Sequence, residues 1–289
     1  MIKEIEYDTI EKLDNTIIQH GKFNDRIYVI KLSRGDFPRI VPRLQQLAQK
    51  HHYQKIIIKA PEWAKNDLEK LGFVEEAAIP GFYEGKGTVH FMAGFLNPER
   101  GVISHLRQQE ILQKLDIARD KGQDPAGPAS LWPSDQSPIV LHADHIPQLA
   151  ALYQAVFDSY PFPIFEESYL LKTLRGHIVY FGIFNNGTLI AASSAETDPE
   201  AGNAEMTDFA TLPEYRGNGL ARVLLAAMEA EMAQRGISTL YTIARTESTG
   251  MNVTFAKSGY HFSGTLVNNT HIAGHIESMN VWYKSLGLI

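Results

Sequence analysis

The sequence predicts an α/β fold, α+β in the wider sense, in which a mixed central sheet has helices on both faces. Two observations lead to this prediction. Strand-like and helix-like segments alternate after residue 138, and the first part of the chain repeats some of the same order. With 289 residues, of which 44% are hydrophobic, the chain has a globular composition and room for two domains.

A proline- and glycine-rich segment separates the two parts of the chain. Residues 121–138 hold four prolines and two glycines and lack the apolar periodicity of a helix or strand. We predict a linker there, and a helix over the preceding segment 102–121. The first domain is therefore expected over 1–120 and the second over 139–289.

The elements of the second domain follow from hydrophobic periodicity and turn signals. The segments that flank Asn186-Gly187 alternate as a β-hairpin does, and 220–235 is a strongly amphipathic helix. The predicted strands are 139–141, 178–184, 188–197, 204–212, 240–245, 260–268 and 275–284. The predicted helices are 145–159, 168–174, 220–235 and 252–258.

The first domain repeats the later part of this pattern. A helix over 38–50 leads to a strand over 55–59 and then to a short helix that closes on Gly72-Phe73. The second domain has the same succession and closes on Gly259-Tyr260. We interpret this as a diverged internal duplication. The alternative is that any stretch with this order of elements looks similar.

Charge and composition argue against several functions. There are 27 Lys and Arg against 33 Asp and Glu, and this net charge of −6 gives no general basis for binding nucleic acid or an anionic membrane. Without cysteine the chain has no disulfide, thiolate nucleophile or zinc–cysteine site. The first residues contain no apolar signal core. We expect a soluble, cytoplasmic protein.

A glycine-rich turn leads from the predicted strand 204–212 into the predicted helix 220–235. Such a helix start points unpaired backbone N–H groups and its positive end at one spot, which suits a phosphate. The turn matches neither the nucleoside-triphosphate loop nor the full dinucleotide fingerprint, and a plain glycine-rich helix start is the alternative. Its residues are Arg216, Gly217, Asn218, Gly219, Leu220, Ala221 and Arg222.

The pattern Arg216-x-x-Gly219-x-Ala221 resembles the acetyl-CoA loop of the GCN5-related N-acetyltransferases (GNAT), whose consensus is Q/R-x-x-G-x-G/A. The order of elements resembles that family over about 139–286. The resemblance implies a GNAT fold, acetyl-CoA as co-substrate with its pyrophosphate on the loop amides, and direct acetyl transfer to an amine. It also implies cofactor contacts at Thr211 and at Ser248, which stands where many relatives have asparagine.

Two carboxylates on the strand before the loop are the catalytic candidates. In many relatives a glutamate at the position of Glu205 acts as base, directly or through water; Asp208 is the second candidate. Strand alternation puts Glu205 on one face with Thr207, Phe209 and Thr211, and Asp208 on the other. For either carboxylate the alternative is a strand-edge charge that faces solvent.

The sequence departs from the family at the general acid. Phe255 stands where many relatives have a tyrosine, and it has no proton to give. Tyr241, Tyr260 and Tyr283 are the substitutes that the sequence offers, unless the thiolate leaves into water. Each tyrosine has the alternative of simply packing in the core.

The whole chain looks like the β-lysine N6-acetyltransferases, which act with lysine 2,3-aminomutase in making the compatible solute Nε-acetyl-β-lysine. The resemblance lies in short segments spread along the second domain and in the presence of a distinct first domain. It implies β-lysine as the amine substrate, acetylated on its terminal amine. The segments are 160–163, 241–245, 250–252, 255–260, 268–270 and 276–282.

Such a substrate needs acidic groups for its ammonium ends and donors for its carboxylate. Asp208 and Glu277 are the candidates for an ammonium, because a buried ammonium without a carboxylate is costly. A loop that contains Tyr160 and Phe162 is expected to close over the site. The candidates for the carboxylate offer guanidinium or amide donors and are Arg245, Asn252, Asn268 and Asn269.

Acetylation of β-lysine is one of several functions that the sequence allows. A GNAT enzyme for another small amine or a peptide amine, and a CoA-binding sensor without activity, are the alternatives. The histidine pairs His142/His145 and His271/His275 have no clear third ligand, so we expect no metal. The first domain lacks the loop motif and is expected to be GNAT-like but non-catalytic. Packing on the second domain, forming a wall of its site and forming a homodimer surface stay open for it.

Overall fold

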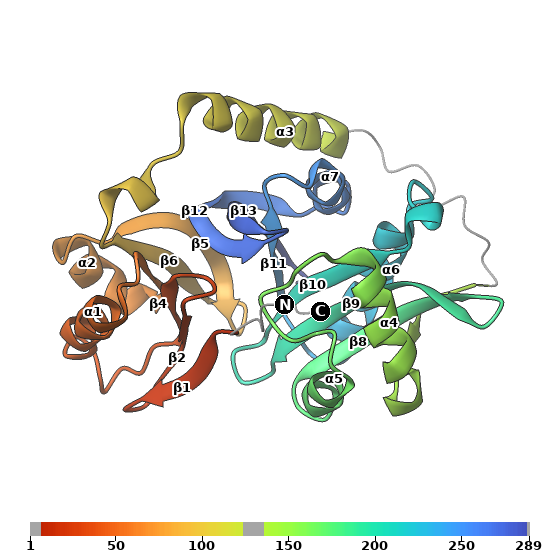
Figure 1. The fold of residues 1–289 in the computed structure, drawn as a ribbon, viewed down its shortest axis with the longest axis horizontal. Coiled ribbons are helices and arrows are strands. Elements are labelled where there is room, and N and C mark those ends of the chain that lie inside the picture. Colours follow the sequence, from red (N-terminus) through yellow and green to blue (C-terminus); the bar gives the residue numbers. More distant parts are fainter. Residues whose placement is uncertain (1–6, 124–135, 288–289) are drawn as a thin grey trace, which may run out of the picture.

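The computed structural model describes residues 7–123 and 136–287, which form two mixed β-sheets that pack against each other (Figure 1). The first sheet has the strand order β1-β2-β3-β4-β6-β5. Its strands are β1 (Thr9–Leu13), β2 (Thr16–Gly21), β3 (Arg26–Lys31), β4 (Lys55–Pro61), β5 (Val74–Tyr83) and β6 (Gly87–Phe95). Helices α1 (Ile40–His51) and α2 (Glu62–Lys70) cover one face of this sheet, and α3 (His105–Gln123) follows it in the chain.

The second sheet has the order β12-β13-β11-β10-β9-β8-β7. Its strands are β7 (Ile139–Val140), β8 (Ile178–Asn185), β9 (Thr188–Asp198), β10 (Asn203–Thr211), β11 (Thr239–Arg245), β12 (His261–Ile272) and β13 (His275–Ser285). Helices α4 (Ile146–Val156) and α5 (Glu167–Leu174) lie on one face, and α6 (Leu220–Gln234) and α7 (Thr249–Lys257) on the other. The predicted mixed sheet with helices on both faces is confirmed.

The two sheets share one connectivity. The order β1-β2-β3-β4-β6-β5 matches β8-β9-β10-β11-β13-β12, with β7 added at the edge. In each half a helix joins two parallel strands, α1 between β3 and β4 and α6 between β10 and β11. This is the arrangement that a diverged duplication predicts. Strands β1 to β3 lie before the first predicted element, the helix over 38–50, and were not predicted.

Several element ends differ from the prediction. The helix predicted over 145–159 ends at Val156, because Phe157 already has extended backbone and the chain then enters the proline-containing segment 160–163. Strand β12 continues four residues past its predicted end, and α7 begins three residues before its predicted start. Helix α3 runs two residues past its predicted end into the predicted linker, and most of that linker lies outside the described residues. Among the helices of the described ranges, none has the length and apolar character needed to cross a membrane.

The face of the first sheet that α1 and α2 leave open packs on the second sheet beside α4 and α5. Apolar side chains from both sheets, such as Ile57 and Phe91 against Tyr241 and Met279, form one continuous core there. Helix α3 then crosses to the other side of the second sheet, where Leu115 packs beside α7 (Figure 1). The two halves of the chain are therefore joined on both faces of the second sheet.

A buried ion pair lies where strand β5 meets β12. The Lys55 ammonium is 2.7 Å from the Glu76 carboxylate, and the side chains are 0% and 4% exposed. The Lys55 ammonium also donates to the Val267 carbonyl at 2.8 Å, and the Glu76 carboxylate accepts from the Val267 amide at 2.8 Å. Gly264 on the same strand has no side chain because a Cβ there would lie 2.1 Å from the Glu76 carbonyl oxygen.

Replacing Lys55 with methionine tests how strongly this pair holds the halves together. The variant would leave a buried carboxylate unpaired, so we expect the free energy of unfolding, measured by urea denaturation, to fall by about 3–5 kcal/mol. Lys55→Met/Glu76→Leu should recover only part of the loss, because Val267 keeps unpaired backbone groups. The control is Lys70→Met, which removes an exposed ion pair to Asp67. Equal stabilities of Lys55→Met and Lys70→Met would contradict this account.

Candidate active site

The glycine-rich turn starts helix α6 with backbone groups directed outward. Gly217 and Gly219 have φ values of 84° and 76°, in the left-handed region that glycine adopts at little cost. Gly219 is the N-cap residue and offers no side chain, so the first helical amides, Leu220 and Ala221 among them, have no intrahelical acceptor. A Cβ at Gly217 would meet nothing within 4 Å. The turn therefore gives α6 an open N-terminus without a side-chain cap, which is compatible with the predicted anion site.

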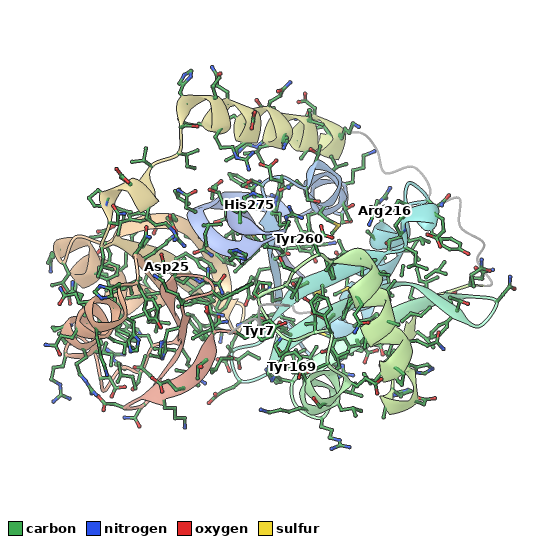
Figure 2. All side chains as sticks on the ribbon, in the orientation of Figure 1. Tyr7, Asp25, Tyr169, Arg216, Tyr260 and His275 are labelled. Atoms are coloured by element: carbon green, nitrogen blue, oxygen red, sulfur yellow. The ribbon has the colours of Figure 1, made fainter. Side chains whose placement is uncertain are left out.

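The side chains around this turn mostly support its backbone. Arg216 is exposed, as Figure 2 shows, and its Nε donates to the Thr211 carbonyl at 3.2 Å. Asn218 donates from Nδ2 to the Tyr215 carbonyl at 3.0 Å. Ser248, the remaining cofactor candidate, is the N-cap residue of α7. Its hydroxyl does not cap the helix.

Strand β10 has a bulge before the turn, which overturns the predicted alternation. Thr207 pairs with Ser194 but Ala210 with Ala192, so β10 has one residue more than β9 between these pairs, and Asp208 has a φ of 55°. Asp208 therefore turns to the α4–α5 face, where Glu205 also lies, and Phe209 packs on the α6–α7 face. The predictions that Asp208 points away from Glu205 and that Phe209 shares a face with Glu205 are both wrong.

Asp208 is held by three hydroxyl groups. Ser194 donates to one carboxylate oxygen at 2.6 Å, and Tyr160 and, at 3.5 Å, Thr207 donate to the other. Burial raises the pKa of Asp208, although these hydrogen bonds oppose the shift. Because each oxygen already accepts a hydrogen bond, Asp208 is better suited to fix the loop at Tyr160 than to take a proton from a substrate. Phe162 in the same loop stacks on Tyr169 of α5, at 6.5 Å between ring centres.

Glu205 lies in a cluster of charges between the two sheets. Glu196 is directly opposite it on β9. The Tyr241 hydroxyl bonds to Glu205 and accepts from Lys59 of the first sheet at 3.3 Å. Like charges on facing strand positions oppose folding, so this pair is expected where function requires it. Glu205, Glu196 and Lys59 are only partly buried, and each keeps some accessible surface.

The pKa shifts in this cluster have a common cause. Burial raises the pKa of Glu205, and the nearby charge of Lys59 and the Tyr241 hydrogen bond only partly offset it. Burial and the neighbouring carboxylates of Glu205 and Asp208 raise the pKa of Glu196. Burial lowers the pKa of Lys59 against the pull of both glutamates. A carboxylate with a raised pKa takes up a proton more readily at neutral pH, which suits a general base.

The three tyrosines that could replace the missing acid lie in different places. Tyr241 contacts Glu205. Tyr260 belongs to the core on the α6–α7 face, packed edge-on to Phe255 at 5.1 Å, across the sheet from Tyr169 in Figure 2. Tyr283 pairs with Tyr241 on β13 and contacts His261. Of the three, Tyr241 is the one in the Glu205 cluster.

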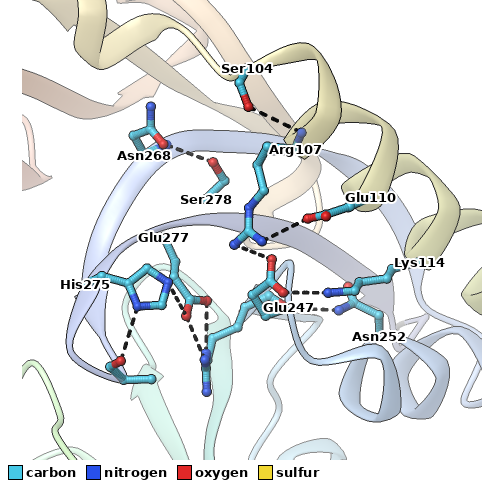
Figure 3. A network of polar contacts seen from close by, with 12 residues as sticks. Ser104, Arg107, Glu110, Lys114, Glu247, Asn252, Asn268, His275, Glu277 and Ser278 are labelled. Atoms are coloured by element: carbon cyan, nitrogen blue, oxygen red, sulfur yellow. Dashed lines mark hydrogen bonds and ion pairs between the residues drawn. The ribbon is translucent and has the colours of Figure 1, made fainter.

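Several residues that were predicted to bind the substrate already bond to one another or to the backbone. Arg245 forms a two-pronged ion pair with Glu277 at 2.6 and 3.0 Å, and His275 lies 3.3 Å from the same carboxylate (Figure 3). Asn252 donates to the carbonyls of Arg245 and Ser248. Its oxygen accepts from Asn280 and Trp282, both at 2.9 Å. All four hydrogen-bonding positions of Asn252 are filled, so it supports the fold and does not suit a substrate carboxylate.

Glu277 is also neutralised, because it forms an ion pair with Arg245. The Glu277 side chain is 0% exposed, whereas that of Arg245 is 34% exposed. The expected ammonium site at Glu277 is therefore not favoured by this geometry. In the neighbouring network, Glu247 pairs with Arg107 and Lys114 of α3, and Arg107 also pairs with Glu110 at 3.2 Å (Figure 3). These contacts fix α3 against the loop before α7.

Asn268 and Asn269 bind the first half of the chain. The Asn268 amide donates to the carbonyls of Arg100 and Val102 at 3.0 and 3.1 Å. The Asn269 carbonyl accepts from Arg26 of β3 at 2.5 Å, and the side-chain oxygen of Asn269 is buried with no partner within residues 7–123 and 136–287. Asn268 thus has a structural role, whereas Asn269 stays open to a ligand.

The sequence did not predict the residues from other strands that surround Glu205. Glu196, Lys59, Arg26 and Tyr28 contribute to the cluster, and three of them come from the first sheet. The sequence signal that could have found them is the alternation of polar and apolar residues, since Arg26 and Tyr28 flank the apolar Ile27 on β3. A polar face on a strand indicates either solvent or a partner, and the sequence does not tell which.

Comparison with known proteins identifies relatives along nearly the whole chain. Residues 147–260 match the acetyltransferase (GNAT) family. The chain is 36% identical over 277 residues to beta-lysine N(6)-acetyltransferase of Methanococcus maripaludis, covering 96% of this chain and 98% of the relative. It is 33% identical to N-acetyltransferase YodP of Bacillus subtilis (93% and 96% covered). It is 30% identical to beta-lysine N(6)-acetyltransferase of Methanosarcina mazei (87% and 98% covered).

The predicted loop motif lies within the matched segment, and the relatives extend the similarity through the first half of the chain. The protein therefore belongs to the GNAT family of N-acetyltransferases.

Proposed function

We propose that this protein transfers the acetyl group of acetyl-CoA to the terminal amine of β-lysine. The observation that carries the proposal is the 36% identity to a beta-lysine N(6)-acetyltransferase over 96% of the chain. The charge cluster around Glu205 supports it, because an amine substrate requires a base and acidic surroundings.

Acetyl-CoA supplies an activated acetyl group as a thioester. The start of α6 fits its pyrophosphate, because the outward amides at Gly219, Leu220 and Ala221 and the positive helix end favour an anion. Arg216 in the turn is exposed, and Arg222 in the first turn of α6 is half-buried. Thr211 and the bulged strand β10 lie next to the turn, where the rest of the cofactor would pass toward Glu205.

Glu205 acts as the base in this proposal. A terminal ammonium must lose its proton before the nitrogen can attack the thioester carbonyl, and the raised pKa of Glu205 suits proton uptake directly or through a water. Tyr241 and Lys59 hold the Glu205 carboxylate from one side. With no cysteine in the chain, a cysteinyl acyl-enzyme is excluded and attack by the amine is direct.

The product has chemistry that suits a compatible solute. Acetylation removes the charge of the terminal ammonium and leaves one ammonium and one carboxylate, so the product has no net charge. We propose that making such a neutral zwitterion is the purpose of the reaction, in line with the resemblance to β-lysine N6-acetyltransferases.

Gly219→Ala tests the cofactor loop. A Cβ at the N-cap would stand between the backbone and the pyrophosphate, so the Kd for acetyl-CoA, measured by calorimetry, should rise about tenfold or more. The control is Gly236→Ala at the other end of α6, where φ is also 76° and a Cβ meets nothing within 4 Å. The same backbone strain then affects both variants. Equal affinities for acetyl-CoA in the two would refute the loop assignment.

Glu205→Gln tests the base. The variant keeps the shape but loses basicity, so kcat should fall about 100-fold while acetyl-CoA still binds. In the unaltered enzyme kcat/KM should rise with pH through the raised pKa of Glu205, and this limb should vanish in Glu205→Gln. Glu196→Gln, the facing residue in the same surroundings, is the control and should keep the limb. If Asp208→Asn is inactive and Glu205→Gln fully active, the two roles are reversed.

The substrate itself is tested by comparing amines at saturating acetyl-CoA. Release of free thiol should show kcat/KM for β-lysine at least about tenfold above α-lysine, because each misplaced polar group leaves a partner in the site unpaired. Mass spectrometry should place the acetyl group on the terminal nitrogen. A preference for a peptide amine, or acetyl-CoA binding without any turnover, would reject the proposal and favour the other GNAT functions.

A further inference from the structure

Three cations of the first sheet face the second half of the chain. They are Arg26 on β3 and Lys55 and Lys59 on β4, and they alternate with apolar residues that pack under α1 and α2. Lys55 is neutralised by Glu76 at 2.7 Å. Lys59 lies beside Glu205 and Glu196, whose charges act on it. The carboxylates whose charges act on Arg26, Asp8 and Glu76, do not lie at ion-pair distance from it.

Arg26 is a buried guanidinium without an ion pair. It is 5% exposed, and within the described parts of the chain no carboxylate lies at ion-pair distance from it. One nitrogen, Nη1, donates to the Asn269 carbonyl at 2.5 Å and to the Thr270 hydroxyl at 3.2 Å. Its Nε is buried with no hydrogen-bond partner among the described residues. A buried cation in this state strongly favours an anion that completes it.

An unpaired acceptor belongs to the same network. The Asn269 amide nitrogen donates to the same Thr270 hydroxyl at 3.2 Å, and its Oδ1 is buried with no partner in the described part of the chain. Arg26 Nε and Asn269 Oδ1 therefore belong to one small network centred on Thr270. A donor for a carboxylate beside an acceptor for an ammonium is the pattern that the head group of an amino acid requires.

This network lies at one end of the Glu205 cluster. The Arg26 guanidinium is 5.2 Å from the centre of the Tyr28 ring, and the Lys59 ammonium is 5.7 Å from the same ring. Lys59 in turn contacts Tyr241, which bonds to Glu205. Tyr28, Lys59 and Glu205 keep accessible surface, whereas Arg26 and Asn269 are almost completely buried. The Tyr28 ring thus lies between Lys59, beside the base, and the buried Arg26 network.

We propose that the first half of the chain completes the substrate site, with Arg26 binding the carboxylate of the amino-acid substrate and Asn269 the ammonium next to it. The proposal rests on the proposed acetylation of β-lysine and adds the residues that recognise it. The head group lies at the Arg26 network, the hydrocarbon chain lies along the Tyr28 ring, and the terminal amine reaches Glu205. The first half is then a specificity wall that a single GNAT domain lacks.

Removing one substrate group at a time provides the test. The enzyme and its Arg26→Gln and Asn269→Ala variants are assayed with β-lysine, with 1,4-diaminopentane, which lacks the carboxylate, and with 6-aminohexanoate, which lacks the 3-amino group. Arg26→Gln should lower kcat/KM at least about tenfold for the two carboxylates and leave 1,4-diaminopentane within about twofold. Asn269→Ala should lower it for the two diamines and leave 6-aminohexanoate within about twofold.

A matched control separates binding from support of the fold. Arg100 is also a buried arginine of the first half, and it donates to the Asn268 carbonyl at 2.7 Å, but it has Asp25 within 3.6 Å. Arg100→Gln should affect all three substrates equally. If Arg26→Gln does not fold, Arg26→Lys keeps the charge without the planar fork and should show the same dependence on the carboxylate with a smaller factor.

The outcomes distinguish this inference from the proposed function. If β-lysine is acetylated but Arg26→Gln lowers activity equally on all three amines, the inference is wrong and the proposed function stands. If Lys59→Met, and not Arg26→Gln, shows the loss that depends on the carboxylate, Lys59 is the anchor and the inference is also wrong. If the unaltered enzyme acetylates none of the three amines, the proposed function fails and the inference falls with it.

Discussion

Burial of charge between the two sheets is the constraint on which the rest of this structure depends. The sheets meet face to face, and a charged group enclosed there needs a partner, because several kcal/mol per ion are lost when water is removed. Lys55 and Glu76 satisfy each other and also bind the backbone of Val267, so that one pair fixes β5 against β12. With this contact in place, the polar face of the first sheet lies opposite Glu205. The active-site charges are therefore a consequence of how the halves dock.

The bulge in β10 arranges the other side of the same site. One extra residue turns Asp208 to the face of Glu205, where Ser194 and Tyr160 donate to it. The bulge thereby ties the loop at Tyr160 to the strand that carries the base. Pairing with β9 resumes at Ala210 and Thr211, whereas the parallel pairing of β10 with β11 ends at Glu205, which frees that edge of β10 beside the proposed cofactor site. A local irregularity therefore connects the substrate loop, the base and the start of α6.

The sequence predicted the parts of this protein that depend on local rules. Helix α6, the hairpin at Asn186-Gly187 and the glycine turn each carry their own short-range signal, and the structure contains them. Strand alternation failed at Asp208, because a bulge shifts the period and leaves no sequence mark there. Asn252 was expected to donate to a substrate, but its amide nitrogen donates to the carbonyls of Arg245 and Ser248. Its oxygen accepts from Asn280 and Trp282, which lie far along the chain. Such long-range pairing, like that of Lys59 with Tyr241, depends on strand register and docking, which single-sequence patterns do not encode.

The shared connectivity of the two halves explains how one of them became free for another task. The turn before α1 occupies the place that the glycine turn has before α6, but Asp36 stands in it. Its carboxylate accepts from the Asn15 amide at 2.9 Å and the Thr16 hydroxyl at 2.8 Å, so the turn is closed by an anion of its own. A negative group there opposes a phosphate. We propose that the first half holds no cofactor, and its sheet face is then not needed for cofactor chemistry. That face can carry cations against the second half, and under the proposal for Arg26 it selects the substrate.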